Sequence, residues 1–501
     1  MRIVLVSFQV NSDVIGVKYL HAYLTAQGHD SSILLIPKVT DANLQAALLY
    51  VVEARPGAVG FSTMSYEFAK TKDFARSVRA ALPGTPLIFG GIHPTSGPED
   101  CLDVADFVVR GEGEETLAEL LPILAGEVSG NFEDVAGLVF KRDGYAVYAP
   151  VRQPVQDLDA LPFPGHLPEG MFVIHRGQVR SVQEKAIYKT YGRYQGTFPS
   201  ILTSRGCPYS CTYCCNSVFQ SLYGRLKIRT RSPENVIEEL EQLVRDFKNI
   251  SYVNFADDCF TVHPLPWLER FRELYTERIG LPFVARATPR HVTREKLTVL
   301  RKAGLHWMLM GLQTGSDRIN REVYDRNTTA EDFLETAQVS SELKLAAWYD
   351  VITDNPYETE EDQLETIDVL LRTPRPFQVA FFSLDFFPGT ELMRRALADG
   401  VPVPALGTKS YMEAEPTIIN RCLRMGGTFP RFLTRFIVKN RHNALGAVVC
   451  RISYAVGLLA EPVMYVYLTH RANDMGAWRT VKVVHSFCIE AAKKLLFKIQ
   501  G

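Results

Sequence analysis

Three cysteines, Cys207, Cys211 and Cys214, follow one another with the spacing C-x3-C-x2-C, directly after an apolar, strand-like run at residues 199–203. Soft thiolate ligands favour iron–sulfur clusters, and three thiolates on one short loop can hold three corners of a 4Fe-4S cube. The fourth iron then has no protein ligand. A small molecule with its own amine and carboxylate, such as S-adenosylmethionine, can chelate that open iron.

Other uses of cysteine fit this segment less well. The chain has nine cysteines, an odd number without regular spacing, which disfavours a disulfide framework. A zinc site would need a fourth Cys or His at ligand spacing, and none follows the triad within the next forty residues. Cys215 lies beside Cys214 and cannot easily reach the same cluster face, so we interpret it as a packed thiol. Zinc and redox-active thiols remain the alternatives to a cluster.

The residues around the triad strengthen the cluster interpretation. Arg205-Gly206 precede the first cysteine and the aromatic Tyr213 precedes the third, and in this context the segment resembles the radical S-adenosylmethionine (SAM) superfamily. The resemblance implies a partial (β/α)6 TIM-type barrel whose chemistry lies at the carboxyl ends of the strands. Six apolar runs alternate with helical patterns as that barrel requires, at residues 199–203, 252–255, 283–287, 307–310, 347–353 and 378–384.

By the same resemblance, polar residues at the expected strand ends are candidates for binding SAM. Asp257 and Asp258 stand where the family has an acidic motif for the amino group, and a strand turns only one of them inward. Arg286 would pair with the methionyl carboxylate, or instead form a salt bridge with one of these acids. The other SAM candidates are Gln313, which can hydrogen-bond a ribose hydroxyl, Gly315 and Tyr213.

A later strand end offers candidates for the substrate site. Asp350, Asp354 and Asn355 follow the fifth run, and capping of helices and turns is the alternative role for such residues. The aromatic segment at residues 381–387 could form the wall of an apolar substrate pocket.

Residues 1–125 alternate short apolar runs with helical stretches, which predicts a parallel, doubly wound sheet. Five runs suggest a flavodoxin-like (Rossmann-like) arrangement, in which ligands lie outside the carboxyl ends of the strands. Glycines in the loops there would by themselves indicate only turns. The runs lie at residues 3–7, 32–36, 58–62, 87–89 and 107–109.

Three loop segments, at residues 60–64, 90–95 and 109–117, together resemble the cobalamin-binding domain that precedes many radical SAM cores. The Asp-x-His-x-x-Gly motif that supplies a cobalt ligand has no match after the first strand, and neither His21 nor His93 has its flanks. Cobalamin is therefore expected to bind without a histidine ligand to cobalt. The resemblance implies cobalamin contacts at Ser62, Thr63, Met64, Gly90, Gly91, His93, Pro94, Gly111 and Glu112.

Turn signals divide the chain into four parts. A hairpin signal around Asp143-Gly144 closes the first domain, and a Pro-rich connector follows it. We predict a cobalamin-binding domain at residues 1–150, a linker or cleft segment at 151–196, a radical SAM core at 197–394, and a mostly helical substrate or accessory region at 395–501.

The last region contains an apolar stretch at residues 444–468. Arg451 and Glu461 interrupt it, which disfavours a membrane-spanning helix and favours a buried helix pair broken near Glu461-Pro462. Basic flanks at residues 431–441 and 482–498, together with Trp478, are compatible with a peripheral membrane surface that delivers a lipid or pigment.

The overall charge argues against a nucleic-acid partner. The 501 residues include 55 Lys and Arg against 56 Asp and Glu, so no general basic field would attract phosphate backbones. The apolar run at the start is too short for a secretory signal. We expect a cytoplasmic protein, with peripheral contact to the inner face of the membrane as the extension that the basic flanks allow.

The cofactors implied by the resemblance are a 4Fe-4S cluster, SAM and cobalamin, with flavodoxin or ferredoxin as an external electron donor. They imply cleavage of SAM to a 5′-deoxyadenosyl radical and, as the first hypothesis, methylation of an unactivated carbon in a small-molecule or lipid-like substrate. A radical cyclisation or oxidative rearrangement, similar to that of a tetrapyrrole cyclase, is the second hypothesis. A cobalamin-binding sensor without catalytic activity is the third.

Overall fold

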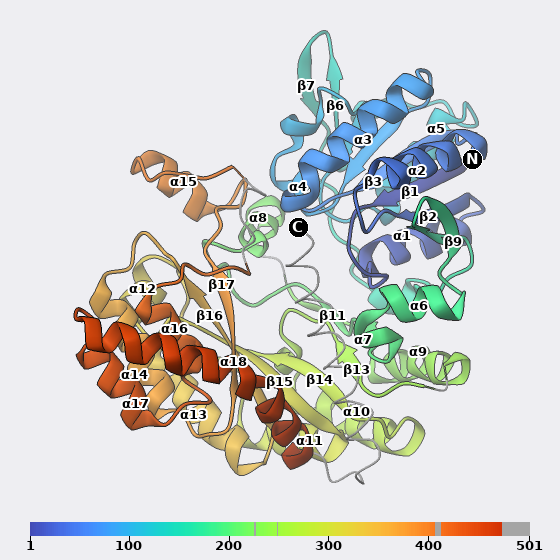
Figure 1. Ribbon diagram of the computed structural model, residues 1–501. Helices are drawn as coiled ribbons and strands as arrows, with labels where there is room; N and C mark the ends of the chain where they lie inside the picture. The colour runs from blue at the N-terminus through green and yellow to red at the C-terminus, as the bar shows by residue number, and fades with distance from the viewer. Residues whose placement is uncertain (225–226, 248, 406–411, 473–501) are drawn as a thin grey trace.

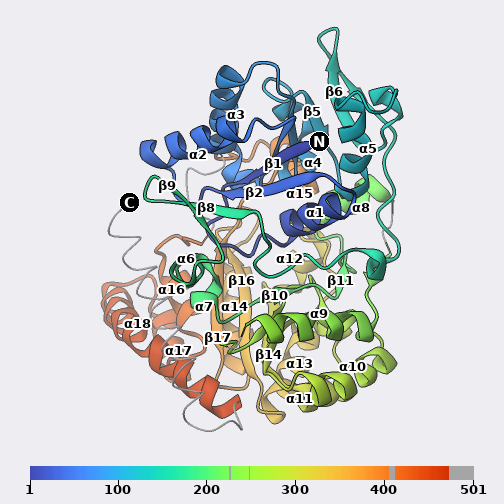
Figure 2. The same ribbon diagram turned by 90° about the vertical axis from the view of Figure 1, so that its right-hand side faces the viewer.

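The computed structural model describes residues 1–224, 227–247, 249–405 and 412–472. Two α/β sheets lie one above the other, and helices from the end of the chain pack against the second (Figures 1 and 2). The first sheet has the strand order β7-β6-β5-β4-β3-β1-β2-β8-β9 within the described residues. Its five parallel central strands confirm the flavodoxin-like order, and they are β1 (Arg2–Ser7), β2 (Asp30–Leu35), β3 (Ala58–Ser62), β4 (Leu87–Gly90) and β5 (Phe107–Val109).

Antiparallel hairpins extend both edges of this sheet. The expected hairpin at Asp143-Gly144 is confirmed by β6 (Leu138–Arg142) and β7 (Tyr145–Tyr148). A second hairpin was missed by the sequence analysis, which assigned its residues to a linker. Its strand β8 (Met171–His175) pairs in parallel with β2, and β9 (Gln178–Ser181) completes the edge.

Helices cover both faces of the first sheet and create two separate apolar cores. Side chains of α1 and α5, such as Val17 and Leu117, fill one core, while those of α2 and α3, such as Val51 and Phe74, fill the other. This arrangement leaves the carboxyl ends of the strands open. The helices are α1 (Ile15–Ala26), α2 (Asp41–Ala54), α3 (Phe68–Ala81), α4 (Ile92–Ser96) and α5 (Glu114–Leu124).

Helices α6 (Lys185–Tyr191) and α7 (Arg193–Gly196) lead to a second sheet, which is parallel throughout its described strands. Its strand order, β10-β13-β14-β15-β16-β17, follows the chain and confirms the partial (β/α)6 barrel. A small antiparallel pair, β11 (Ser204–Arg205) and β12 (Arg229–Thr230), flanks the cysteine segment. The barrel strands are β10 (Ser200–Ile201), β13 (Val253–Phe255), β14 (Phe283–Ala287), β15 (Leu305–Gln313), β16 (Ala346–Thr353) and β17 (Gln378–Ser383).

Amphipathic helices surround this barrel. Most begin at a Ser or Thr cap, as in α9, where the Ser232 hydroxyl accepts a hydrogen bond from the Asn235 amide at 3.2 Å. The helices are α8 (Cys215–Tyr223), α9 (Pro233–Asp246), α10 (Leu265–Arg278), α11 (Arg294–Ala303), α12 (Asp317–Glu322), α13 (Ala330–Glu342) and α14 (Glu360–Arg372).

The last helices are α15 (Glu391–Ala398), α16 (Ile418–Met425), α17 (Arg431–Lys439) and α18 (Ala444–Ala472). Side chains of α16 to α18, including Cys422 and Cys450, join the barrel core. The expected break near Glu461-Pro462 is wrong, because α18 continues through both residues. No helix in the described ranges is long and apolar enough to span a membrane. The basic flank at residues 482–498 and Trp478 lie outside the described residues.

Candidate active site between the two domains

The cysteine triad lies on the loop between β11 and α8. Cys214 is the residue that caps α8, and its amide donates to the Cys211 carbonyl at 2.9 Å. Thr212 fixes the middle of the loop, since its amide donates to the Tyr324 carbonyl (3.0 Å) and its hydroxyl to the Val323 carbonyl (2.6 Å). The loop is therefore held in place independently of any metal.

The donor set fits a cluster better than a single ion. All three cysteines are free thiols, with Cys211 buried and the other two half-buried. Within the described part of the chain, no three His, Cys, Asp or Glu side chains converge closely enough to hold one metal ion. Ligands to separate corners of a cube lie farther apart than ligands of one ion, so three thiolates on this loop would hold three irons and leave the fourth open.

The two acids after β13 have different positions. Asp257 is fully buried and accepts hydrogen bonds from the Thr203 amide (3.0 Å), the Thr203 hydroxyl (2.8 Å) and the Ser204 hydroxyl (2.5 Å). It therefore ties β13 to the strand that enters the cysteine loop. Asp258 is exposed and accepts a hydrogen bond from the Asn216 side chain at 3.2 Å. Of the two acids, Asp258 is the one available to a ligand.

Asp257→Ala is expected to lower the free energy of unfolding by about 3 kcal/mol, because the buried Thr203 amide loses its partner. Iron content after reconstitution should fall with it. The matched control, Asp258→Ala, should keep wild-type stability and iron content and weaken SAM binding. Chemical denaturation, iron analysis and SAM titration check these outcomes. Equal loss of stability in both variants would contradict the assignment of Asp257 as the structural acid.

Two charged barrel residues remain unpaired. Arg286 on β14 and Asp350 on β16 make no ion pair or hydrogen bond among the described residues, so the expected alternative of a salt bridge from Arg286 to Asp257 or Asp258 is not formed. Burial raises the pKa of Asp350 to about 6, although Arg286 and Arg326 nearby lower it. An unpaired, half-buried guanidinium favours a carboxylate partner, which a bound ligand can supply.

The other SAM candidates differ in exposure. Gln313 is half-buried at the end of β15 in the left-handed region (φ 67°). Gly315 packs against α14, where an added Cβ would lie 2.5 Å from Thr366 Cα. Tyr213 packs edge-to-face on Tyr324, with ring centroids 4.7 Å apart. Gly315 and Tyr213 therefore have packing roles, whereas the Gln313 side chain remains accessible to a ligand.

Asp354 and Asn355 make structural contacts. Asp354 accepts hydrogen bonds from the side chains of Ser383 and Asn420, both at 2.8 Å, and so joins the barrel to α16. Asn355 donates to the Tyr324 hydroxyl at 3.1 Å. Of the three predicted substrate residues, Asp350 alone lacks such a partner among the described residues.

A cavity of about 380 Å³ lies between the two domains. Its first-domain side comes from loops after β3, β4 and β5, and its barrel side from residues next to the cysteine triad, so the carboxyl ends of both sheets open into one space. Tyr223 and Phe219 of α8 also line it. The predicted residues on the cavity wall are Ser62, Gly90, Gly91, Gly111, Glu112 and Asp258.

The cavity wall suits a flat, bulky ligand such as a corrin. A Cβ at Gly90 would meet nothing nearer than Val109 at 3.9 Å, so bare backbone faces the space. Gly91 has φ 104°, and a Cβ there would lie 2.9 Å from the Thr63 carbonyl oxygen. No histidine lines this cavity among the described residues.

Four predicted cobalamin residues, Thr63, Met64, His93 and Pro94, do not line the cavity. His93 is buried and stacks on Phe68, with ring centroids 3.8 Å apart. Burial lowers the pKa of His93 to about 4, so it is neutral at pH 7. His21 is also buried, beside the Ser31 hydroxyl at 3.1 Å. Both histidines therefore lie buried within the domain.

Gly90→Ala is expected to weaken cobalamin binding about tenfold, because the new methyl group projects from the cavity wall without disturbing the fold. Gly84→Ala is the matched control, since an added Cβ at Gly84 also meets no close atom, but Gly84 lies in an exposed turn outside the cavity. Titration with hydroxocobalamin measures both. Unchanged affinity in the Gly90 variant would exclude this wall as the corrin site.

Ion pairs connect the cobalamin loop to the cluster loop. Arg205, two residues before Cys207, lies 2.7 Å from Glu114 and 3.4 Å from Glu112. Arg229 contacts both carboxylate oxygens of Glu112, at 2.7 and 2.9 Å. Burial alone would raise the pKa of Glu112, but these arginines lower it. We name this group, Glu112, Glu114, Arg205 and Arg229, the interdomain clamp.

Helix α8 adds a third connection. The hydroxyl of Tyr223, at the end of α8, accepts a hydrogen bond from the Glu112 amide at 3.0 Å. Sequence reasoning used Arg205 only as part of the cysteine motif, and missed Tyr223 and Arg229. Their partners lie 111 to 117 residues away along the chain, so local pattern carries no signal for them.

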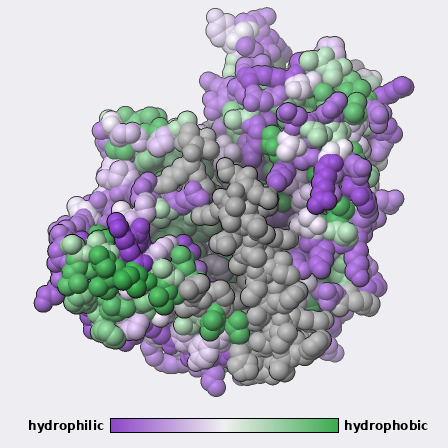
Figure 3. Space-filling model, in the orientation of Figure 1, coloured by the Kyte–Doolittle hydropathy of each residue, from purple (hydrophilic) through white to green (hydrophobic). Residues whose placement is uncertain are grey.

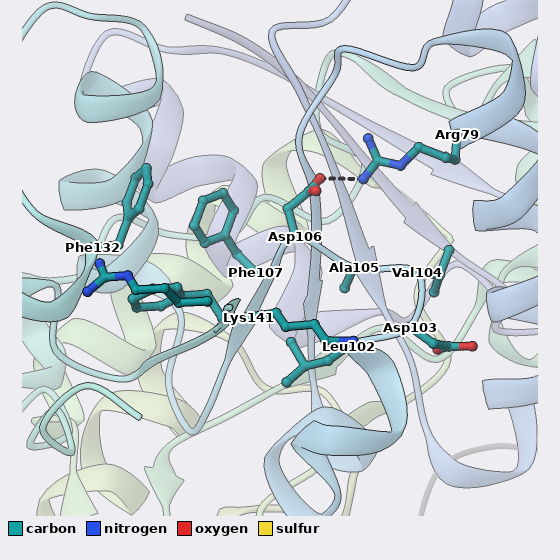
Figure 4. A pocket seen from close by; sticks show the side chains of 11 residues that line it. Arg79, Leu102, Asp103, Val104, Ala105, Asp106, Phe107, Phe132 and Lys141 are labelled. Atoms are coloured by element: carbon teal, nitrogen blue, oxygen red, sulfur yellow. Dashed lines mark hydrogen bonds and ion pairs between the residues drawn. The ribbon is translucent and has the colours of Figure 1, made fainter. Parts of the chain in front are cut away.

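A larger cavity, about 670 Å³, lies at the opposite, amino-terminal end of β5 (Figure 4). Arg79 and Asp106 on its wall pair with each other. None of the candidate residues lines it among those described, so the candidate site is the cavity between the domains.

Comparisons with known proteins agree with this geometry. Residues 1–121 match the B12 binding domain and residues 201–370 the radical SAM superfamily. An uncharacterized methyltransferase of Pyrococcus horikoshii is 25% identical over 81% of this chain and 82% of its own length. The anaerobic magnesium-protoporphyrin IX monomethyl ester cyclase of Rubrivivax gelatinosus is 25% identical over 74% of this chain, which spans 65% of the cyclase.

The fold has a solved counterpart. The radical SAM methyltransferase TsrM of Kitasatospora setae superposes with a TM-score of 0.63 and 19% identity, over 80% of this chain and 77% of TsrM. The two domain matches follow one another in the order of the two sheets. The chain is therefore a cobalamin-dependent radical SAM enzyme, in which a B12-binding domain precedes a radical SAM core and whose cofactors are cobalamin, a 4Fe-4S cluster and SAM.

Proposed function

We propose that this enzyme transfers a methyl group to an unactivated carbon of a small-molecule or lipid-like substrate. One observation carries the proposal: the glycine-lined wall of the B12-binding domain and the residues beside the cysteine triad enclose a single cavity. Radical formation and methyl donation can then act on the same bound substrate. The similarity to a methyltransferase along most of both chains supports this reading.

Different residues of the chain would bind the cluster and SAM. When bound, the cluster with SAM supplies a 5′-deoxyadenosyl radical and cobalamin supplies the methyl group. Cys207, Cys211 and Cys214 would hold the cluster. Asp258 would bind the amino group of SAM and Arg286 its carboxylate, because both lack a strong protein partner.

Other residues would complete the site. Gln313 would hydrogen-bond the ribose, and the half-buried Asp350 would contact the substrate. Ser62, Gly90, Gly91, Gly111 and Glu112 would form the cobalamin wall. Apolar side chains such as Leu20, Ile88 and Phe219 would exclude water from the radical.

Electrons would come from flavodoxin or ferredoxin. A surface groove of about 610 Å³ reaches Cys207 from outside, and Arg394 lies on its wall. Such a groove gives a small redox protein a short path to the cluster. A lipid or pigment substrate would reach the enzyme at a membrane, so peripheral membrane contact through the C-terminal helices belongs to this proposal.

Cyclisation without methyl transfer is the competing function, because the cyclase similarity also covers most of this chain. The test is anaerobic turnover of the reconstituted enzyme with reductant, methyl-labelled SAM and cell extract. Methyl transfer predicts labelled product, S-adenosylhomocysteine and 5′-deoxyadenosine in equal amounts. Formation of 5′-deoxyadenosine without S-adenosylhomocysteine would favour cyclisation and contradict the proposal.

A further inference from the structure

Helix α18 exposes a row of large apolar side chains. Neighbours in the row are three, four or seven residues apart, so they lie on one face of the helix. Figure 3 shows the corresponding green patch over α18. We name this row the α18 ridge; its members and exposed fractions are Leu445 (56%), Val448 (52%), Ile452 (62%), Val456 (55%), Val463 (68%) and Tyr467 (54%).

The opposite face of α18 packs against the barrel, so the ridge points away from it. Cys450, Ser453 and Leu468 on that face are buried, and Cys450 and Leu468 belong to the apolar cores of the barrel. A helix that is apolar on both faces is normally covered on both. The ridge is therefore a surface that another apolar medium is expected to cover.

Helix α17 extends the apolar surface beside the ridge. Phe432 is 73% exposed and Phe436, one turn later, is 39% exposed. The two helices pack against each other. Together the ridge and these two phenylalanines place eight large apolar side chains on the surface, and exposed apolar patches of this kind mark interaction sites.

The same two helices also carry exposed cations. Arg435, Lys439 and Arg451 are exposed and form no ion pair among the described residues. The acids nearby are already neutralised, since Glu461 pairs with Arg424 and Glu360 with Arg441. The rim of the ridge therefore carries uncompensated positive charge.

We propose that the α18 ridge docks on the surface of an anionic lipid membrane. Apolar side chains would enter the region between headgroups and acyl chains, and the three cations would contact anionic headgroups. A second copy of this chain fits less well, because a symmetric contact would bring the cations of both copies together. No described helix can span a bilayer, so the docking is peripheral.

Membrane docking would add a source of substrate to the proposed function. Only the inference about the substrate class rests on that function. A membrane-bound enzyme of this chemistry would take its substrate from the lipid phase, as a lipid or an apolar pigment. Vesicle binding itself requires neither cofactor nor turnover. Failure of docking and failure of methyl transfer can therefore be distinguished.

The test is co-sedimentation of the full chain with vesicles of phosphatidylcholine alone or mixed with phosphatidylglycerol. The protein should bind the anionic vesicles, and binding should weaken with added salt. Ile452→Asp should lower the partition coefficient at least about tenfold. Arg435→Glu and Arg451→Glu should each lower it at least about fivefold.

Matched controls separate docking from general surface effects. Leu49→Asp changes an equally exposed apolar residue on α2 (54%), and Lys302→Glu an exposed cation on α11; both should bind as the wild type does. Circular dichroism checks that every variant is folded. Two results would overturn the proposal: equal binding by Ile452→Asp and the wild type, or a dimer in solution that Ile452→Asp dissociates.

Discussion

Cys211→Ala is expected to abolish formation of 5′-deoxyadenosine while leaving the fold intact. Cys211 is buried on a loop that its neighbour Thr212 anchors to Tyr324 and Val323, so the loop survives without the thiol. Loss of a direct iron ligand should cost more than the about 100-fold that loss of a supporting group costs at metal sites. The measurements are iron and sulfide content, the electron paramagnetic resonance signal of the reduced cluster, and the rate of 5′-deoxyadenosine release.

Cys215→Ala is the matched control for this variant. Cys215 is the first residue of α8 and adjoins the triad, yet we assign it no iron. It should retain the cluster and wild-type activity. Equal loss in both variants would contradict the ligand assignment, and wild-type function without the triad would support a cobalamin sensor instead of an enzyme.

Arg205→Ala is expected to lower the free energy of unfolding by about 3–5 kcal/mol. It should also uncouple SAM cleavage from methyl transfer. The side chains of Arg205 and Glu114 are 16% and 6% exposed, so the variant leaves a buried carboxylate without its cation. The B12-binding domain would then be held less firmly against the cluster loop. SAM cleavage should continue while methylated product falls at least about tenfold.

The double variant Arg205→Ala/Glu114→Gln distinguishes the effect of an unpaired buried charge from the loss of the arginine side chain's packing. Removing the carboxylate should recover most of the lost stability, because no unpaired charge remains buried. Arg278→Ala breaks an exposed pair with Glu241 and should cost less than about 1 kcal/mol. Denaturant unfolding and product ratios provide the measurements. If the single and double variants are equally unstable, the interdomain clamp does not act through charge.

Much of the fold was predictable because local pattern determines it. Buried parallel strands appear as short apolar runs, and the runs at residues 58–62, 107–109 and 283–287 coincide with β3, β5 and β14. The cysteine triad was equally visible, since its three cysteines lie within eight residues. In both cases the signal and the structure occupy the same short segment.

Other features depend on contacts that the sequence does not display. The β8–β9 hairpin joins the first sheet through pairing with β2, well over a hundred residues earlier in the chain. Period-two alternation could not decide between Asp257 and Asp258, because the choice depends on hydroxyl groups of another strand. Helix α18 passes through Pro462 although proline normally ends a helix, since packing against the barrel holds its residues.

The cobalamin loops show the same limit. Three of the predicted glycines, Gly90, Gly91 and Gly111, line the cavity, whereas Thr63 and His93 are buried away from it. A loop motif fixes which residues are near a site but not the direction of each side chain. The partners of Arg205 lie about 90 residues earlier, in the other domain, beyond any local pattern.

We propose that cobalamin and the cluster lie at one shared cavity, with cobalamin on its glycine-lined wall and the cluster on the adjacent cysteine loop. The most direct measurement is electron paramagnetic resonance of the reconstituted enzyme that contains both cob(II)alamin and the reduced cluster. The shared cavity predicts magnetic coupling that broadens the cob(II)alamin signal and that Cys211→Ala removes. Two signals that are independent of each other in the wild-type enzyme would contradict the account.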